Sequence, residues 1–131
     1  MRIMLDTHFL VWMATMPHKI TKRELDALAK RDGDLIVSAI AIWELRMKWH
    51  AYEPKRRDKD SISADAGLGF AQANGFVLAP LDPSDCVIQV VPPIPHRDPF
   101  DEMLLAHAQR LDARLMTRDR KLRGHPLAVQ L

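Results

Sequence analysis

Residues 35–45 read LIVSAIAIWEL, a short β-branched run that passes directly into a segment of helical length. Leu35 to Val37 predicts a buried strand, because a continuous apolar run between polar residues is typical of a parallel sheet. Ser38 can cap a helix over residues 39–49, and Glu44 falls inside that helix. A strand that leads at once into a helix is the repeating unit of an α/β fold.

The same pattern recurs on both sides of this stretch. Further strands are expected at residues 2–5, 76–79 and 114–117, and residues 127–131 are a candidate for one more. Helices are expected over residues 7–16, 21–33, 61–74 and 98–111, and a short one opens at Asp82-Pro83. The alternation predicts an α/β fold, a three-layer α/β/α sandwich with a mostly parallel sheet of four to five strands.

Local signals support several of these boundaries. Thr21 and Glu24 have the spacing of a capping box, and Asp98 precedes a proline at the first position of its helix. The proline-rich residues 92–95 predict a rigid connection. The charged residues 54–60 lack apolar periodicity and are expected to form an exposed loop.

The composition is that of a packed protein. The 131 residues are 47% hydrophobic and 27% charged, which excludes a disordered chain and suits one domain over residues 1–131. No apolar run approaches the roughly 20 residues of a membrane span, and Asp6 comes before a signal-peptide core could form. We therefore expect a cytoplasmic protein with no membrane contact.

The basic and unusual residues have ordinary explanations at this stage. The net charge is +2, and although basic residues cluster at 19–31, 55–59 and 110–123, solvated helix faces explain such clusters more often than phosphate contacts. The single cysteine, Cys86, is expected to be a buried structural thiol. The tryptophans at 12, 43 and 49 are expected to pack in the core rather than to stack on bases.

Four acids can meet at one edge of the predicted sheet. Asp6 follows the first strand and Asp119 the last, Glu44 lies in the second turn of its helix, and Asp101 lies in the first turn of another. Loops after parallel strands open on the same side, so all four can face one crevice. Clustered carboxylates repel unless a cation neutralises them, and oxygen ligands favour Mg²⁺ or Mn²⁺.

Structural explanations remain open for part of this set. Asp98 and Asp101 can both serve only as cap and dipole partners of a helix start. Asp119, between two arginines, can be a solvated turn residue. Asp6 and Glu44 are harder to explain in this way, because an acid against a buried strand or in an apolar helix costs stability unless something pairs with it.

Four segments carry a resemblance to a known family. They are MLDT at residues 4–7, SAIAIWEL at 38–45, HRDPFDEMLLAHA at 96–108 and LMTRD at 115–119. Together they resemble the PIN-domain nucleases, in particular the VapC-like toxins of bacterial type II toxin–antitoxin pairs. The resemblance implies a parallel α/β/α sandwich, cleavage of RNA with Mg²⁺ or Mn²⁺, inhibition by a cognate antitoxin, and a homodimer.

The resemblance also implies roles for individual residues. The first family acid falls on Asp6 and the second on Glu44, which binds metal or orients water. Thr7 is expected as a hydroxyl neighbour of Asp6. The third acid falls on Asp101, although Asp98 is close enough to share or take this role.

The fourth family acid falls on Asp119, with Thr117 as an expected hydrogen-bond partner. Asp119 completes a metal-ligand set with Asp6 and Asp101, or with Asp98 in place of the latter. Arg46 is a candidate contact to RNA or antitoxin, with a structural ion pair equally open. The chain departs from the subgroup at Glu102, where relatives commonly carry arginine.

Two other functions compete with a toxin ribonuclease. One is a catalytically degenerate PIN-like domain that only binds nucleic acid, which retention of all four acids argues against. The other is a metal-dependent phosphatase, which normally needs a nucleophilic aspartate in a different motif.

Overall fold

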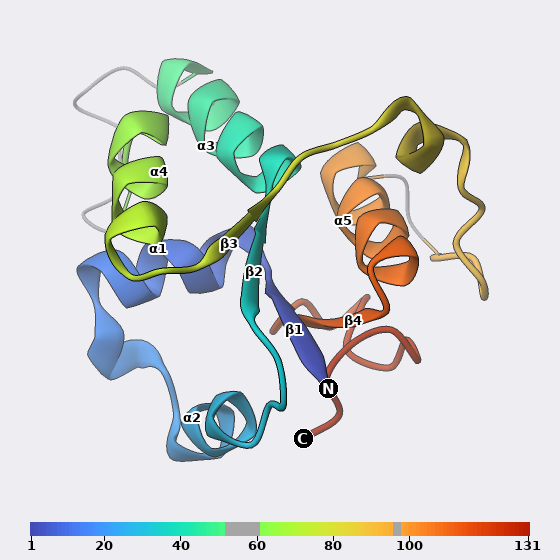
Figure 1. Cartoon of the computed structure of the whole chain (residues 1–131), viewed down its shortest axis with the longest axis horizontal. Coiled ribbons are helices and arrows are strands. Elements are labelled where there is room, and N and C mark those ends of the chain that lie inside the picture. The colour runs from blue at the N-terminus through green and yellow to red at the C-terminus, as the bar shows by residue number, and fades with distance from the viewer. Residues whose placement is uncertain (52–60, 96–97) are drawn as a thin grey trace.

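The computed structural model describes residues 1–51, 61–95 and 98–131, so the predicted loop at 54–60 lies outside the described residues. Strands β1 (Arg2–Leu5), β2 (Leu35–Ser38), β3 (Val77–Ala79) and β4 (Ala113–Met116) form one sheet in the order β3-β2-β1-β4, and each neighbouring pair is parallel. The predicted α/β architecture with a parallel sheet is confirmed (Figure 1).

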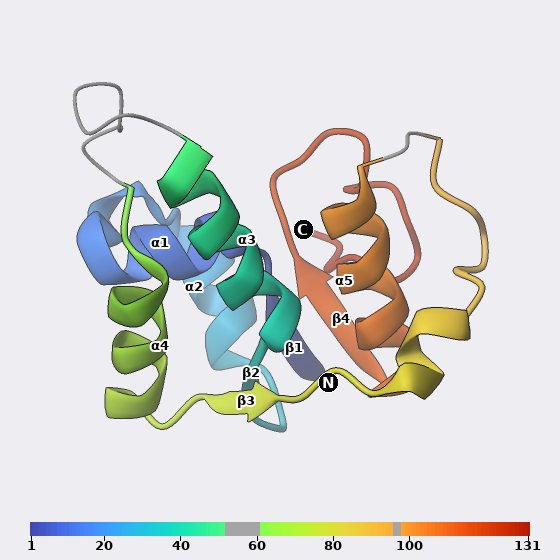
Figure 2. The same ribbon diagram turned by 90° about the horizontal axis from the view of Figure 1, so that it is seen from above.

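Helices connect these strands in the order that the sequence predicted. They are α1 (Thr7–Thr15), α2 (Lys22–Ala29), α3 (Ala39–Ala51), α4 (Ala64–Ala73) and α5 (Pro99–Arg110), with the 3-10 helices η1 (Pro17–Lys19) and η3 (Pro83–Val87). In both overall views α3 lies between α4 and α5, and it contacts both helices as well as α1 (Figures 1 and 2).

The core surrounds the two central strands. Ile3, Met4 and Leu5 of β1 and Ile36 of β2 have no exposed surface. The backbone N–H of Asp6 donates to the carbonyl of Met116 at 3.0 Å, which extends the pairing of β1 and β4 by one residue. The first candidate acid is therefore fixed at the end of the central strand.

The predicted caps are present. The Thr21 hydroxyl accepts from the Glu24 N–H at 3.2 Å, and the Glu24 carboxylate accepts from the Thr21 N–H at 2.9 Å, which completes the capping box of α2. Ser38 Oγ accepts from the Ile40 N–H at the start of α3. Helix α2 ends at Ala29, four residues before the predicted end near Gly33.

The candidate fifth strand is reduced to a single bridge. Leu115 pairs with Ala128 in parallel, with hydrogen bonds from the Leu115 N–H to Leu127 and from the Val129 N–H to Leu115. Leu115 is the only residue of β4 that takes part in these two bonds. Residues 127–131 therefore do not form a strand, and the sheet has four strands.

Two predictions about burial were wrong. Cys86 is exposed, because its neighbour Asp85 takes the buried position of the short helix η3. Trp43 is 48% exposed, because the turn of α3 that directs Ala41 and Glu44 inward directs Trp43 outward. Within the described part of the chain, no helix is long and apolar enough to cross a membrane.

Candidate active site

A pocket of about 280 Å³ brings the predicted acids together. Its lining residues come from α1, α3, the start of α5 and the segment after β4: Asp6, His8, Trp12, Glu44, Lys48, Asp98, Asp101, Arg118 and Asp119. All four predicted acids line it, and so does Asp98, the rival for the third position. The expectation that they face one crevice therefore agrees with the structure.

Asp6 is the first of two buried acids in this site, with 7% of its surface exposed. One carboxylate oxygen accepts from the Thr7 N–H at 2.7 Å, and the other accepts from the Thr117 hydroxyl at 2.7 Å. Burial raises the pKa of Asp6, and the nearby charge of Glu44 raises it further, while the hydrogen bond from Thr117 opposes both. Any cation that approaches Asp6 therefore stabilises the ionised form of its carboxylate.

Glu44 is the second buried acid, and both of its oxygens are engaged. Oε1 accepts from the Thr7 hydroxyl at 2.8 Å, and Oε2 forms an ion pair with Lys48 one turn later on α3. Thr7 therefore contacts Glu44 through its side chain and Asp6 through its backbone. Burial lowers the pKa of Lys48, but Glu44, Asp98 and Asp6 together outweigh burial and raise it.

Thr117 joins the first acid to the fourth. Its hydroxyl donates to Asp6 and accepts from the Asp119 N–H at 3.1 Å. One carboxylate oxygen of Asp119 accepts from the Lys121 N–H at 2.9 Å, which forms a turn after β4. The predicted partnership of Thr117 and Asp119 is present, and the bond to Asp6 is an addition that sequence reasoning missed.

Asp98 and Asp101, the two candidates for the third acid, have different structural roles. Asp98 caps α5, because one of its carboxylate oxygens accepts from the N–H groups of Phe100 at 2.9 Å and Asp101 at 3.3 Å. Asp101 lies in the first turn of the same helix. The cap interpretation of Asp98 is therefore confirmed, and both carboxylates still line the pocket.

One wall of the pocket is aromatic and cationic, and sequence reasoning did not assign it to the site. Trp12 is half-buried and His8 stacks beside it with ring centroids 5.9 Å apart. Arg118 lies 4.4 Å from the Trp12 ring centre. The signal available in the sequence was the spacing of His8 and Trp12, which follow Asp6 on one face of α1. Arg46, in contrast, is exposed and is not among the residues that line the pocket.

The donor set suits a hard divalent cation. Five carboxylates line the pocket against two permanent cations, and Lys48 is already paired with Glu44 while Arg118 is paired with Glu24 outside the pocket. Such an excess of negative charge on oxygen donors fits Mg²⁺ or Mn²⁺. Among the described residues, however, no three acidic, histidine or cysteine side chains converge closely enough to hold an ion, so binding requires side-chain rotation.

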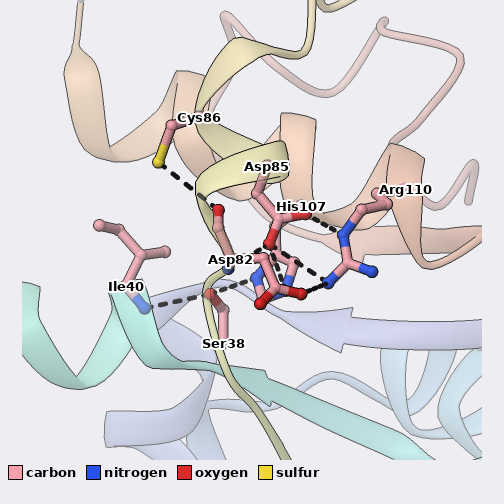
Figure 3. Close-up of polar contacts among 7 residues, drawn as sticks. All are labelled: Ser38, Ile40, Asp82, Asp85, Cys86, His107 and Arg110. Carbon is pink, nitrogen blue, oxygen red and sulfur yellow. Dashed lines mark hydrogen bonds and ion pairs between the residues drawn. The ribbon is translucent and has the colours of Figure 1, made fainter.

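A second polar cluster is drawn in Figure 3, and none of its residues lines this pocket. Ser38 Oγ and His107 Nδ1 share a hydrogen bond of 2.7 Å, and Arg110 forms an ion pair with Asp85. His107 Nε2 is 3.9 Å from Asp85, which is too long for a hydrogen bond. Ser38 and His107 have no exposed surface, so this serine, histidine and aspartate tie β2, η3 and α5 together rather than meet a substrate.

Comparisons with known proteins agree with this architecture. The family model of the PIN domain matches residues 3–126. Among solved structures, VapBC2 from Rickettsia felis bound to a DNA fragment from its promoter matches with a TM-score of 0.57 and 18% identity, over 98% of this chain and 96% of that chain. This level of identity supports the fold alone. The curated proteins gave no match.

Proposed function

The chain belongs to the PIN-domain family, and on this premise we propose that it is a metal-dependent endoribonuclease that hydrolyses RNA phosphodiester bonds. The observation that carries the proposal is the pocket in which Asp6, Glu44, Asp101 and Asp119 meet, with Asp98 beside them. We propose that residues 1–131 form a single nuclease domain.

Asp6, Asp101 and Asp119 are the proposed ligands of Mg²⁺ or Mn²⁺, with Asp98 as the alternative to Asp101. When bound, the ion supplies a water of lowered pKa and a positive charge near the leaving oxygen. The carboxylates of the pocket repel a phosphate by themselves, and a cation held by Asp6, Asp101 and Asp119 would offset that repulsion.

Glu44 is proposed to orient the attacking water. Thr7 and Lys48 hold its two oxygens, so the carboxylate has a fixed direction next to Asp6. Thr117 fixes Asp6 in the same way from β4. Groups held in this manner need little rearrangement during the reaction, which is how preorganised sites lower barriers.

We further propose that the chain is the toxin of a type II toxin–antitoxin pair in the cytoplasm. The resemblance of its motifs to VapC-like toxins and the fold shared with VapBC2 support this. Trp43 and Met47 are exposed on α3, and Trp43 contacts Phe100, so an apolar surface is available to the antitoxin. Arg46 remains a candidate contact on the same helix, and the homodimer remains a prediction.

Incubation of the purified protein with mixed RNA and Mn²⁺ tests the proposal. We expect cleavage by the wild type, none in the presence of a chelator, and a loss of at least 100-fold in Asp6→Asn. Asp26→Asn, which removes an exposed acid of α2, is the matched control and should retain full activity. Equal cleavage by Asp6→Asn and Asp26→Asn would rule out this pocket as the nuclease site.

The spread of the carboxylates favours a second candidate, a PIN-like domain that binds nucleic acid without cleaving it. Calorimetric titration with Mn²⁺ separates the two. The nuclease should bind Mn²⁺ and lose that binding in Asp6→Asn, whereas RNA binding without any Mn²⁺ binding would favour the degenerate domain. Turnover of a simple phosphate ester without RNA cleavage would instead indicate a phosphatase.

A further inference from the structure

We propose that His8 and Trp12 form a wall that holds one nucleobase of single-stranded RNA next to the carboxylates. This inference rests on the proposed nuclease function and names the form of its substrate. It starts from the composition of the pocket, which contains an aromatic and cationic side as well as an acidic one.

The wall is built on the helix that begins at the first acid. Asp6 caps α1, and His8 and Trp12 follow it two and six residues later. Because a helix rises about 1.5 Å per residue, Trp12 lies roughly 9 Å along the axis from Asp6. The two rings stack with centroids 5.9 Å apart and planes at 21°, and the imidazole of His8 is exposed. A flat surface is therefore presented beside the proposed metal ligands.

The back of the wall is fixed by Arg118. Its guanidinium lies 4.4 Å from the Trp12 ring centre and makes two hydrogen bonds to Glu24, of 2.6 and 2.7 Å. Glu24 belongs to the capping box of α2, so α1, α2 and the segment after β4 all hold the indole in place. Because these contacts already hold the indole of Trp12 in place, the side chain loses little conformational entropy when a nucleobase stacks on the wall.

The size and charge of the pocket select the occupant. At about 280 Å³ it is just below the roughly 300–1,000 Å³ range of ligand sites, which suits an occupant no larger than one nucleotide. A phosphate drawn to the acidic side through a cation leaves its base to face the aromatic side. Bases in a duplex are already stacked and paired, so the wall selects single-stranded RNA. Core packing by itself does not account for the exposed ring of His8.

The test measures binding of a labelled single-stranded RNA by fluorescence anisotropy with Mn²⁺, in a Glu44→Gln background, which keeps the proposed metal ligands and removes the carboxylate proposed to orient the attacking water. Trp12→Leu and His8→Ala should weaken binding, by about tenfold for the tryptophan, and Trp12→Phe should retain most of it because a ring remains. Trp43→Leu removes an exposed tryptophan that lies outside the pocket and should bind like the background.

A series of RNAs, each with one abasic nucleotide, gives a second measurement that does not depend on the folding of a variant. In the background protein, one abasic position should weaken binding about tenfold, and Trp12→Leu should abolish that difference. Trp12→Leu and His8→Ala binding as tightly as Trp43→Leu, or no sensitive abasic position, overturns the wall while leaving the nuclease proposal intact. Failure of the otherwise unmodified protein to bind or cleave any RNA overturns both.

Discussion

The Thr117→Val substitution tests whether the hydroxyl that joins two acids of the site holds them in place. Thr117 Oγ1 donates to Asp6 in a buried hydrogen bond and accepts from the Asp119 N–H in a partly buried one. Valine has nearly the same shape as threonine but lacks the hydroxyl. The substitution therefore removes two hydrogen bonds without creating a cavity.

The expected magnitude follows from the partners. A hydrogen bond to a charged group contributes about 1.5–3 kcal/mol, so the free energy of unfolding should fall by roughly that amount in Thr117→Val. The hydrogen bond from Thr117 also lowers the pKa of Asp6, against the effect of burial. Without it the pKa of Asp6 rises further, so the metal-dependent cleavage rate should need a higher pH to reach its plateau.

Urea unfolding measures the first effect, and the pH dependence of RNA cleavage with Mn²⁺ measures the second. Thr117→Ser is the matched control, because serine keeps the hydroxyl and loses only a methyl group. Serine should stay close to the wild type in its pH dependence. If valine and serine variants show the same stability and the same pH dependence, the hydroxyl does not hold Asp6 and the reasoning is refuted.

Three further predictions concern stability and the third acid. Burial lowers the pKa of His107, so as the pH falls the unfolded chain takes up a proton near pH 6.5, before the folded protein does. The free energy of unfolding should therefore be highest above that pH and decrease as the pH falls. Urea unfolding between about pH 7.5 and 5 should show a shallower decrease for His107→Gln than for the wild type. An added Cβ at Gly67 would lie 2.5 Å from Leu45 Cδ1, while one at Gly69 would meet nothing within 4 Å. In thermal melts, Gly67→Ala should therefore destabilise the protein by about 1 kcal/mol, and Gly69→Ala should stabilise it by ~0.5–1 kcal/mol. The opposite order would contradict the packing of α4 on α3. Asp98→Ser keeps a helix cap and removes a carboxylate, so stability should stay within ~0.5 kcal/mol of wild type and cleavage should persist if Asp101 is the third ligand; lost Mn²⁺ binding would assign that role to Asp98.

The order of strands and helices was predictable because its signals are local. The capping box of Thr21 and Glu24, and the cap at Asp98, depend on residues three or fewer positions apart. The meeting of the acids was predictable from topology, since parallel strands open their loops on one side. The buried environments of Asp6 and Glu44 also follow from their positions beside a central strand and inside an apolar helix.

The rest depends on contacts between distant segments, which periodicity does not encode. Thr117 and Asp6 are 111 positions apart, and Ser38 and His107 are 69 apart, so neither bond has a sequence signal. The outward direction of Trp43 was missed because a helix that is apolar on most of its surface gives little indication of which side faces the core.

The acids of the pocket divide into two groups by what holds them. Asp6 and Glu44 are buried and fixed by hydroxyl, backbone and ammonium donors. Asp98 and Asp119 lie at a helix start and in a turn, where each has oxygens bonded only to neighbouring backbone N–H groups among the bonds described. On the proposed function, Glu44 orients the attacking water and Asp6 binds the ion from a fixed position, whereas Asp98 and Asp119, the outer acids, adjust to the ion. Substitution of Glu44 should therefore act mainly on the rate constant of cleavage, because it removes the group that positions the attacking water for the transition state. Substitution of the outer acids should act mainly on metal affinity, because it removes a ligand of the ion.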